Sequence, residues 1–169
     1  EPAATNICLQ SEDFSTTWTT FDATITTNTV ISPDGATTAD TFTTSDIDYS
    51  SVYQTVTTVS GVTYTASVYA KAGTVSTLAL EFRGSGSSPD AIFDLSSGTV
   101  SSGTGTIEDA GNNWYRCSIT EAAVDTSELF IIGRGASGAI GDTIYLWGAQ
   151  VETGPIATSY IPTTTASVT

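Results

Sequence analysis

Three of the four basic residues of this chain, Lys71, Arg83 and Arg116, lie in segments where apolar and polar residues alternate. Basic residues are scarce, since the chain has only four of them among 169 residues and carries a formal net charge of -14. Guanidinium and ammonium groups donate hydrogen bonds to hydroxyls and carboxylates, and aromatic rings pack on the apolar faces of sugars. Basic side chains beside aromatic rings therefore indicate glycan binding. The glycan could be neutral or acidic.

The alternation in these segments predicts which side chains leave the core. In a strand, successive side chains point to opposite faces. The predicted inward set is Tyr64, Ala66, Val68, Ala70, Leu78, Leu80, Phe82, Tyr115, Cys117 and Ile119. If these strands belong to one sheet, its outer face carries a candidate carbohydrate-binding site made of Tyr69, Lys71, Glu81, Arg83, Trp114 and Arg116.

An alternative interpretation is that the charged residues form ordinary cross-strand ion pairs on a solvated face. Arg134 shares a predicted face with apolar neighbours, so its direction is left open. Tyr49 and Tyr53 lie beside a predicted loop and are further binding candidates, whereas the alternation assigns no face to Trp147. The aromatic residues predicted for the core are Phe14, Trp18, Phe21, Tyr64, Phe82, Phe93 and Tyr115.

The elements that must position these residues are short strands. Turn sequences rich in Gly, Asn and Asp recur about every eight to twelve residues, and no helical period is sustained. The expected strands span residues 6–10, 24–31, 38–44, 51–58, 62–71, 76–84, 91–95, 104–108, 113–121, 127–134 and 143–151. The sequence therefore predicts an all-β fold, a jelly-roll β-sandwich, with a closed barrel as the alternative.

A chain of this length is expected to form one domain with a substantial core. We place the β-sandwich in residues 1–162 and a Thr-rich tail, either a linker or an oligomer contact, in residues 163–169. The two cysteines, Cys8 and Cys117, are interpreted as buried apolar side chains, with a disulfide as the alternative. The chain has no histidine, which excludes Cys-His nucleophiles and His-containing zinc sites.

The acidic charge argues against nucleic acid as a partner, because phosphates repel a negative surface. Membrane insertion is not expected either, because no apolar run approaches the roughly 20 residues of a membrane span. The N-terminal sequence EPAATNICLQ has no signal-peptide pattern, so either a signal was removed or the chain is one module of a longer protein. The polar, Thr-rich composition suits an extracellular location.

Carboxylates cluster at Glu12 and Asp13 and at Asp46 and Asp48, and Asp40 and Glu152 are further oxygen donors. A structural Ca²⁺ could use such ligands, although no spacing matches a calcium loop and chance clustering is the alternative. No pair of acids is placed for glycoside hydrolysis. A lyase could use Tyr69 as base with Arg83 or Arg116, but we expect no enzyme.

Several blocks resemble a family of β-sandwich modules at the C-terminal ends of bacteriophage tail-fibre and related virion proteins. They are NICLQSEDFSTTW, SPDGATTADTF, GVTYTASVYAKAG, NNWYRCSIT and IYLWGAQVETGPIATSYIPT, in that order. The same order is more distantly similar to carbohydrate-binding modules of polysaccharide-degrading enzymes, which are jelly rolls, often with a structural calcium. Those modules commonly have two aspartates where this chain has Gly148-Ala149-Gln150, which puts a calcium ligand there in doubt.

The resemblance implies a non-catalytic carbohydrate-binding or host-surface adhesion domain of a phage virion protein, on a virion surface or outside the cell. One alternative is a structural virion or fibre-assembly domain that binds no sugar. Another is a carbohydrate-binding module of a polysaccharide-degrading enzyme. The expected partner is a glycan or polysaccharide, and a homo-oligomer is an alternative, a trimer if the chain is part of a fibre.

Overall fold

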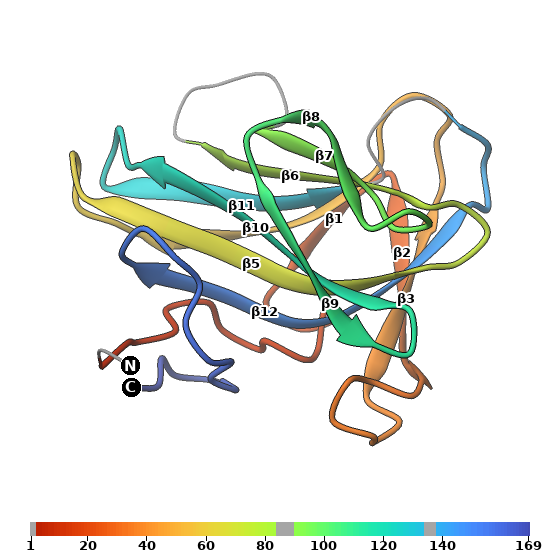
Figure 1. Cartoon of the computed structure of the whole chain (residues 1–169), viewed down its shortest axis with the longest axis horizontal. Helices are drawn as coiled ribbons and strands as arrows, with labels where there is room; N and C mark the ends of the chain where they lie inside the picture. The colour runs from red at the N-terminus through yellow and green to blue at the C-terminus, as the bar shows by residue number, and fades with distance from the viewer. Residues whose placement is uncertain (1–2, 84–89, 134–137) are drawn as a thin grey trace.

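The computed structural model describes residues 3–83, 90–133 and 138–169, and every regular element in them is a β-strand (Figure 1). The strands form two antiparallel sheets of six strands each. The first, here the β4 sheet, has the spatial order β1 (Thr19–Phe21), β4 (Ser51–Thr57), β11 (Ser127–Gly133), β6 (Thr77–Arg83), β7 (Ala91–Asp94) and β8 (Thr99–Gly103). The second, here the β5 sheet, has the order β2 (Ala23–Val30), β3 (Ala39–Thr44), β12 (Thr143–Thr153), β5 (Thr63–Ala72), β10 (Trp114–Ala122) and β9 (Thr106–Gly111).

The core lies between the two sheets and is built from the alternating inward residues of both. The predicted inward residues of β5, β6 and β10 are buried or pack against this core. The alternation predicted these faces correctly because the period of two is a property of each strand by itself. The architecture is the predicted jelly-roll sandwich.

Consecutive strands often belong to opposite sheets. The chain passes from β4 to the other sheet at β5 and returns at β6, and it repeats this exchange at β10, β11 and β12. Segments that are close in sequence, such as β5 and β6, therefore present their outer faces on opposite sides of the molecule.

The two terminal segments lie together beside the sandwich (Figure 1). The expected strand at residues 6–10 is reduced to an isolated bridge between Asn6 and Val168. The Thr-rich tail is joined to the N-terminal segment, since Gln10 N donates to Thr164 O at 2.8 Å and Thr163 Oγ1 donates to Cys8 O at 2.6 Å. These bonds hold the start of the Thr-rich tail against the N-terminal segment.

Other expectations agree or differ in detail. The strands β1 and β8 were not predicted, because β1 has three residues and β8 is rich in Ser and Gly.

Cys8 and Cys117 are both free and buried, and burial raises the pKa of each thiol. Arg134 lies outside the described residues. No helix in the described part of the chain is long and apolar enough to cross a membrane.

Candidate functional site

The structure divides the six predicted site residues between the two sheets. Arg116 of β10 lies opposite Tyr69 of β5, and Trp114 lies opposite Lys71, all in the β5 sheet. Their predicted partners Glu81 and Arg83 stand on β6 in the β4 sheet. The prediction that one sheet carries all six is wrong, because the chain changes sheets between β5 and β6.

The group on the β5 sheet is largely closed to solvent. Trp114 is 1% exposed and Arg116 is 8% exposed. The Arg116 guanidinium donates to Thr158 O and to Ser67 Oγ, and it lies 5.4 Å from the centroid of the Tyr69 ring. These contacts fix the guanidinium inside the protein, so its role here is to hold the C-terminal segment on the sheet.

The same C-terminal segment covers the aromatic residues of this face. The Tyr160 ring lies 4.7 Å from Trp147 and 6.0 Å from Tyr69, measured between ring centroids. Its hydroxyl bonds to Ser11 Oγ at 2.7 Å and to Glu12 Oε1 at 3.1 Å, and burial raises its pKa. The aromatic side chains on this face therefore form a small second core.

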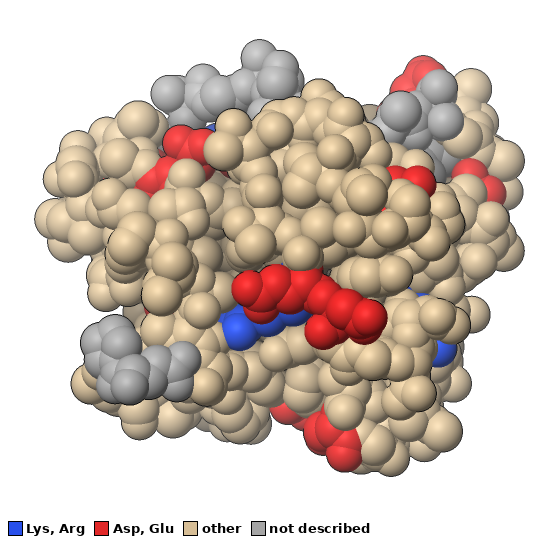
Figure 2. All heavy atoms as spheres, in the orientation of Figure 1, with Lys and Arg blue, Asp and Glu red and all other residues tan. Residues whose placement is uncertain are grey.

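The distribution of charged side chains reflects the small number of basic residues. Figure 2 shows acidic side chains at several places on one face of the molecule, and the basic atoms at its centre lie beside acidic ones. A broad basic surface for polyanions is not seen on this face.

The outer face of the β4 sheet is more open. Two cross-strand rows cross it, one from Tyr53 through Ile131 to Glu81 and one from Leu129 to Arg83. Beside them lies a shallow cavity of about 310 Å³. We call this surface the platform, which comprises Glu81 and the lining residues of the cavity, Phe21, Tyr49, Ser51, Tyr53, Arg83, Leu129 and Ile131.

Two aromatic rings are the most exposed part of the platform. Phe21 is 51% exposed and Tyr49 is 39% exposed, and their ring centroids lie 5.8 Å apart in an edge-to-face arrangement. The prediction that Phe21 belongs to the core is wrong, because it lies on the edge strand β1 and not between the sheets. Tyr49 and Tyr53, which the sequence suggested as binding candidates, both line the cavity.

Glu81 supplies a buried acceptor beside these rings. The residue is 4% exposed, its Oε1 lies 3.5 Å from Arg83 Nε, and its Oε2 accepts from the Tyr49 hydroxyl at 3.5 Å. Within the described residues Oε1 has no hydrogen-bond partner. Burial raises the pKa of Glu81, and the charge of Arg83 partly opposes that rise. A buried carboxylate oxygen without a hydrogen-bond partner is unusual in a folded protein, which marks Glu81 as a candidate acceptor.

Two of the residues considered for calcium, Asp40 and Glu152, are already hydrogen-bonded within the chain. No group of three or more potential metal ligands occurs in the described residues. The two oxygens of Asp40 accept from the backbone amides of Phe14 and Asn28, and those of Glu152 accept from Gln150 and Thr158. The chain itself therefore supplies the donors that saturate these carboxylates.

Comparisons with known proteins identify the fold. No family model matches the sequence, and no curated protein matches it. Among solved structures, the chain is similar to a Clostridium thermocellum xylanase 10B with CBM22-1 and GH10 modules (TM-score 0.55, 15% identity, 94% of this chain and 29% of that chain). It is also similar to the enzymatically active domain of tailspike protein 4 of bacteriophage CBA120 (TM-score 0.54, 18% identity, 88% of this chain and 21% of that chain).

A third similar structure is nearly as long as the chain itself. It is TmCBM61, solved in complex with β-1,4-galactotriose, at a TM-score of 0.52 and 15% identity over 86% of this chain and 97% of that chain. In contrast, the chain spans only about a fifth to a third of the tailspike and xylanase chains. At these identities the likeness concerns the fold, and the chain has the β-sandwich fold of carbohydrate-binding modules.

Proposed function

We propose that this chain is a non-catalytic carbohydrate-binding domain that attaches a phage virion protein of tail-fibre type to glycans of a host surface. The observation that carries the proposal is the platform, where the exposed rings of Phe21 and Tyr49 stand beside the buried, incompletely bonded carboxylate of Glu81. The fold likeness to carbohydrate-binding modules supports the same role.

The platform offers the two kinds of contact that a sugar requires. Aromatic faces bury the apolar C–H surface of a sugar ring. The carboxylate of Glu81 accepts a hydroxyl hydrogen, and the Arg83 guanidinium can donate to an adjacent oxygen. The ion pair keeps these two polar groups 3.5 Å apart before any ligand arrives. Such an arrangement favours binding, because the two side chains lose little conformational entropy when a ligand binds.

The arrangement of acids supports binding without catalysis. Glycosidases generally use two carboxylates about 5 to 9.5 Å apart on either side of the scissile bond. On the platform Glu81 is paired with Arg83. Asp90, which is not part of the platform, accepts the backbone N–H of Phe82 with its Oδ2. The lyase pairing of Tyr69 with Arg83 fails, because these residues lie on different sheets. Arg116, the other basic residue considered for a lyase, lies opposite Tyr69 but is buried and bonded to Thr158 and Ser67.

The phage tailspike among the similar structures supports the proposed placement in a virion. A second candidate, a binding module of a polysaccharide-degrading enzyme, is favoured by the likeness to the modular xylanase. Both candidates place the domain outside the cell or on a virion surface. A homo-oligomer, a trimer in a fibre, remains a prediction.

The proposed function is tested by binding the purified chain to an array of neutral and acidic oligosaccharides of two to six units. We expect selective retention that falls about tenfold or more in Arg83→Ala. Lys71→Ala is the matched control, because it also removes one basic residue from a strand but on the β5 sheet, and it should bind like the wild type.

Two results would contradict the proposal. A folded wild-type chain that retains no oligosaccharide would favour the structural virion role. Loss of retention in Lys71→Ala together with normal retention in Arg83→Ala would place the site on the β5 sheet.

A further inference from the structure

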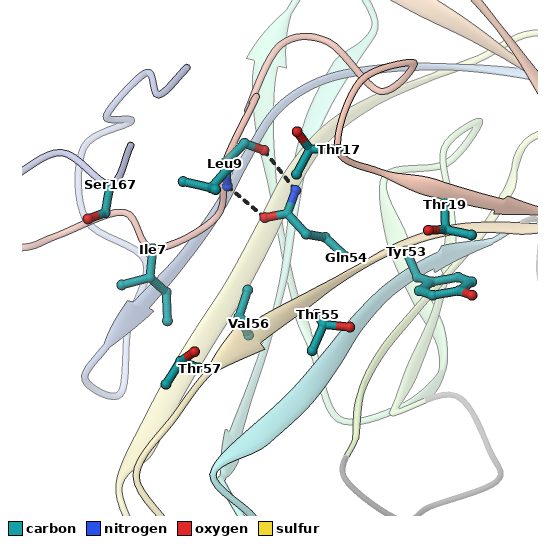
Figure 3. A pocket seen from close by; sticks show the side chains of 10 residues that line it. All are labelled: Ile7, Leu9, Thr17, Thr19, Tyr53, Gln54, Thr55, Val56, Thr57 and Ser167. Atoms are coloured by element: carbon teal, nitrogen blue, oxygen red, sulfur yellow. Dashed lines mark hydrogen bonds between the residues drawn. The ribbon is translucent and has the colours of Figure 1, made fainter. Parts of the chain in front are cut away.

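A second hollow lies next to the platform. It has a volume of about 440 Å³ and lies between β4 and the N-terminal segment (Figure 3). Tyr53 lines both this hollow and the platform cavity. The two hollows are therefore neighbours on either side of Tyr53, and we call the second hollow the β4 groove.

The β4 groove extends the platform across the sheet, away from β6. Its sheet side is formed by Tyr53 and Thr55 of β4 and by Thr19, which pairs with Tyr53 at the edge strand β1. Neighbouring strands are about 4.8 Å apart, so the path from β6 through β11 and β4 to β1 measures about 15 Å. This length exceeds that of a single sugar ring.

The far wall of the groove is held in place by a buried side chain. Gln54 accepts from Leu9 N at 2.7 Å and donates to Leu9 O at 2.8 Å, and Figure 3 shows this side chain reaching from β4 to Leu9. The pair of bonds fixes the N-terminal segment opposite β4. The groove is therefore formed before a ligand binds.

The lining of the groove determines which ligand it suits. Its polar groups are mainly the hydroxyls of Thr17, Thr19, Thr55, Thr57 and Ser167. Apolar surface comes from Ile7, Leu9 and Val56, and no described residue that lines the groove is charged. An ion would find no counter-charge there, whereas a chain of sugar rings presents both hydroxyls and apolar C–H faces.

We propose that the β4 groove is a second subsite, which binds the continuation of an uncharged oligosaccharide whose first units lie on the platform. The inference rests on the proposed function and adds that the ligand is a neutral glycan bound along its chain. On the platform, Arg83 is the only cation among the described lining residues, and Glu81 balances it. An acidic glycan would therefore gain no net charge attraction from these residues.

The subsite is tested by isothermal titration with disaccharides and hexasaccharides. The β-1,4-xylo and β-1,4-galacto series are always included, together with every neutral series that the array retains. We expect the hexasaccharide of the bound series to bind about tenfold tighter than its disaccharide, because only the longer chain reaches the groove.

Two variants locate the effect of length. Thr57 is exposed in the groove, so Thr57→Arg should fill it and reduce hexasaccharide affinity to that of the disaccharide. Thr106→Arg makes the same change at an exposed position of β9 on the other sheet and should leave both affinities unchanged. Tyr49→Ala should weaken both ligands, because both use the platform.

Three results of these titrations would contradict the second subsite. Equal affinity for the two lengths in the wild type would overturn the second subsite and leave the proposed function standing. A length effect that survives Thr57→Arg would also overturn it, because the extra units would then lie elsewhere. No binding of any oligosaccharide by the folded chain would overturn both proposals.

Discussion

Glu81 combines burial with a position on the outer face of a sheet, which makes it the most informative single residue. Burial raises its pKa, and so does the charge of Asp90, whereas Arg83 and the Tyr49 hydroxyl lower it. If the ionised carboxylate accepts a sugar hydroxyl, affinity should weaken as the pH falls through this raised pKa. The Glu81→Gln variant should bind about tenfold more weakly at neutral pH and should lose this pH dependence. Titrations between about pH 4 and 7 measure both effects.

The stability of the free protein should change with pH in the opposite sense. The folded chain holds the Glu81 proton to a higher pH than the unfolded chain does, so the free energy of unfolding falls as the pH rises through that interval. Asp90 has a raised pKa and contributes with the same sign. Chemical denaturation of Glu81→Gln should show a smaller fall than the wild type, and an identical fall would contradict the raised pKa of Glu81.

At the scale of the elements, strand β12 contains an irregularity that depends on a glycine. Its register with β5 shifts between Trp147 and Gln150, and Gly148 has a φ of +63°. A Cβ at this position would lie 2.9 Å from Tyr69 Cδ2. Because Tyr69 is packed against Trp147 and Arg116, it cannot move without disturbing the second core.

We therefore expect Gly148→Ala to lower the free energy of unfolding by about 2–4 kcal/mol, from backbone strain and overpacking together. Gly35→Ala is the control, since Gly35 also has a positive φ but no atom within 4 Å of an added Cβ. It should cost about 1–2 kcal/mol. Denaturant titration compares the two, and an equal loss would show that the ring contact is unimportant.

At the scale of the whole molecule, hydrogen bonds of buried side chains hold the terminal segments against the sandwich. Buried Asn6 and Gln150 connect the terminal segments to β12, since Asn6 Nδ2 donates to Ala149 O and Gln150 Oε1 accepts from Ile161 N. The carboxylate of Glu152 is saturated in the same region.

We expect neither a calcium chelator nor added calcium to move the Tm by more than about 1 °C, because a bound ion would stabilise the folded state by mass action. Thermal unfolding followed by circular dichroism measures this. A calcium-dependent rise of several degrees would show that these oxygens rearrange around a metal. Substituting Glu152→Gln would then locate the ligand.

The sequence by itself determined the properties that each strand carries alone. The period of two identified the residues of β5, β6 and β10 that face the core between the sheets, and turn residues separated most of the strands. It also singled out Glu81 and Arg83, because a charged residue out of phase with the core is visible locally, and Tyr49 and Tyr53, because they lie beside a predicted loop. Phe21 was misassigned because a three-residue edge strand is too short for its alternation to show which side faces the core.

Only the tertiary structure decided which strands share a sheet. Pairing of β6 with β11 joins residues about fifty positions apart and places Glu81 next to Ile131, while β5 and β10 pair in the opposite sheet. The same long-range packing laid the C-terminal segment over Arg116 and set the N-terminal segment opposite β4. Such contacts depend on the balance of burial and pairing across the whole chain, and no local pattern contains that information.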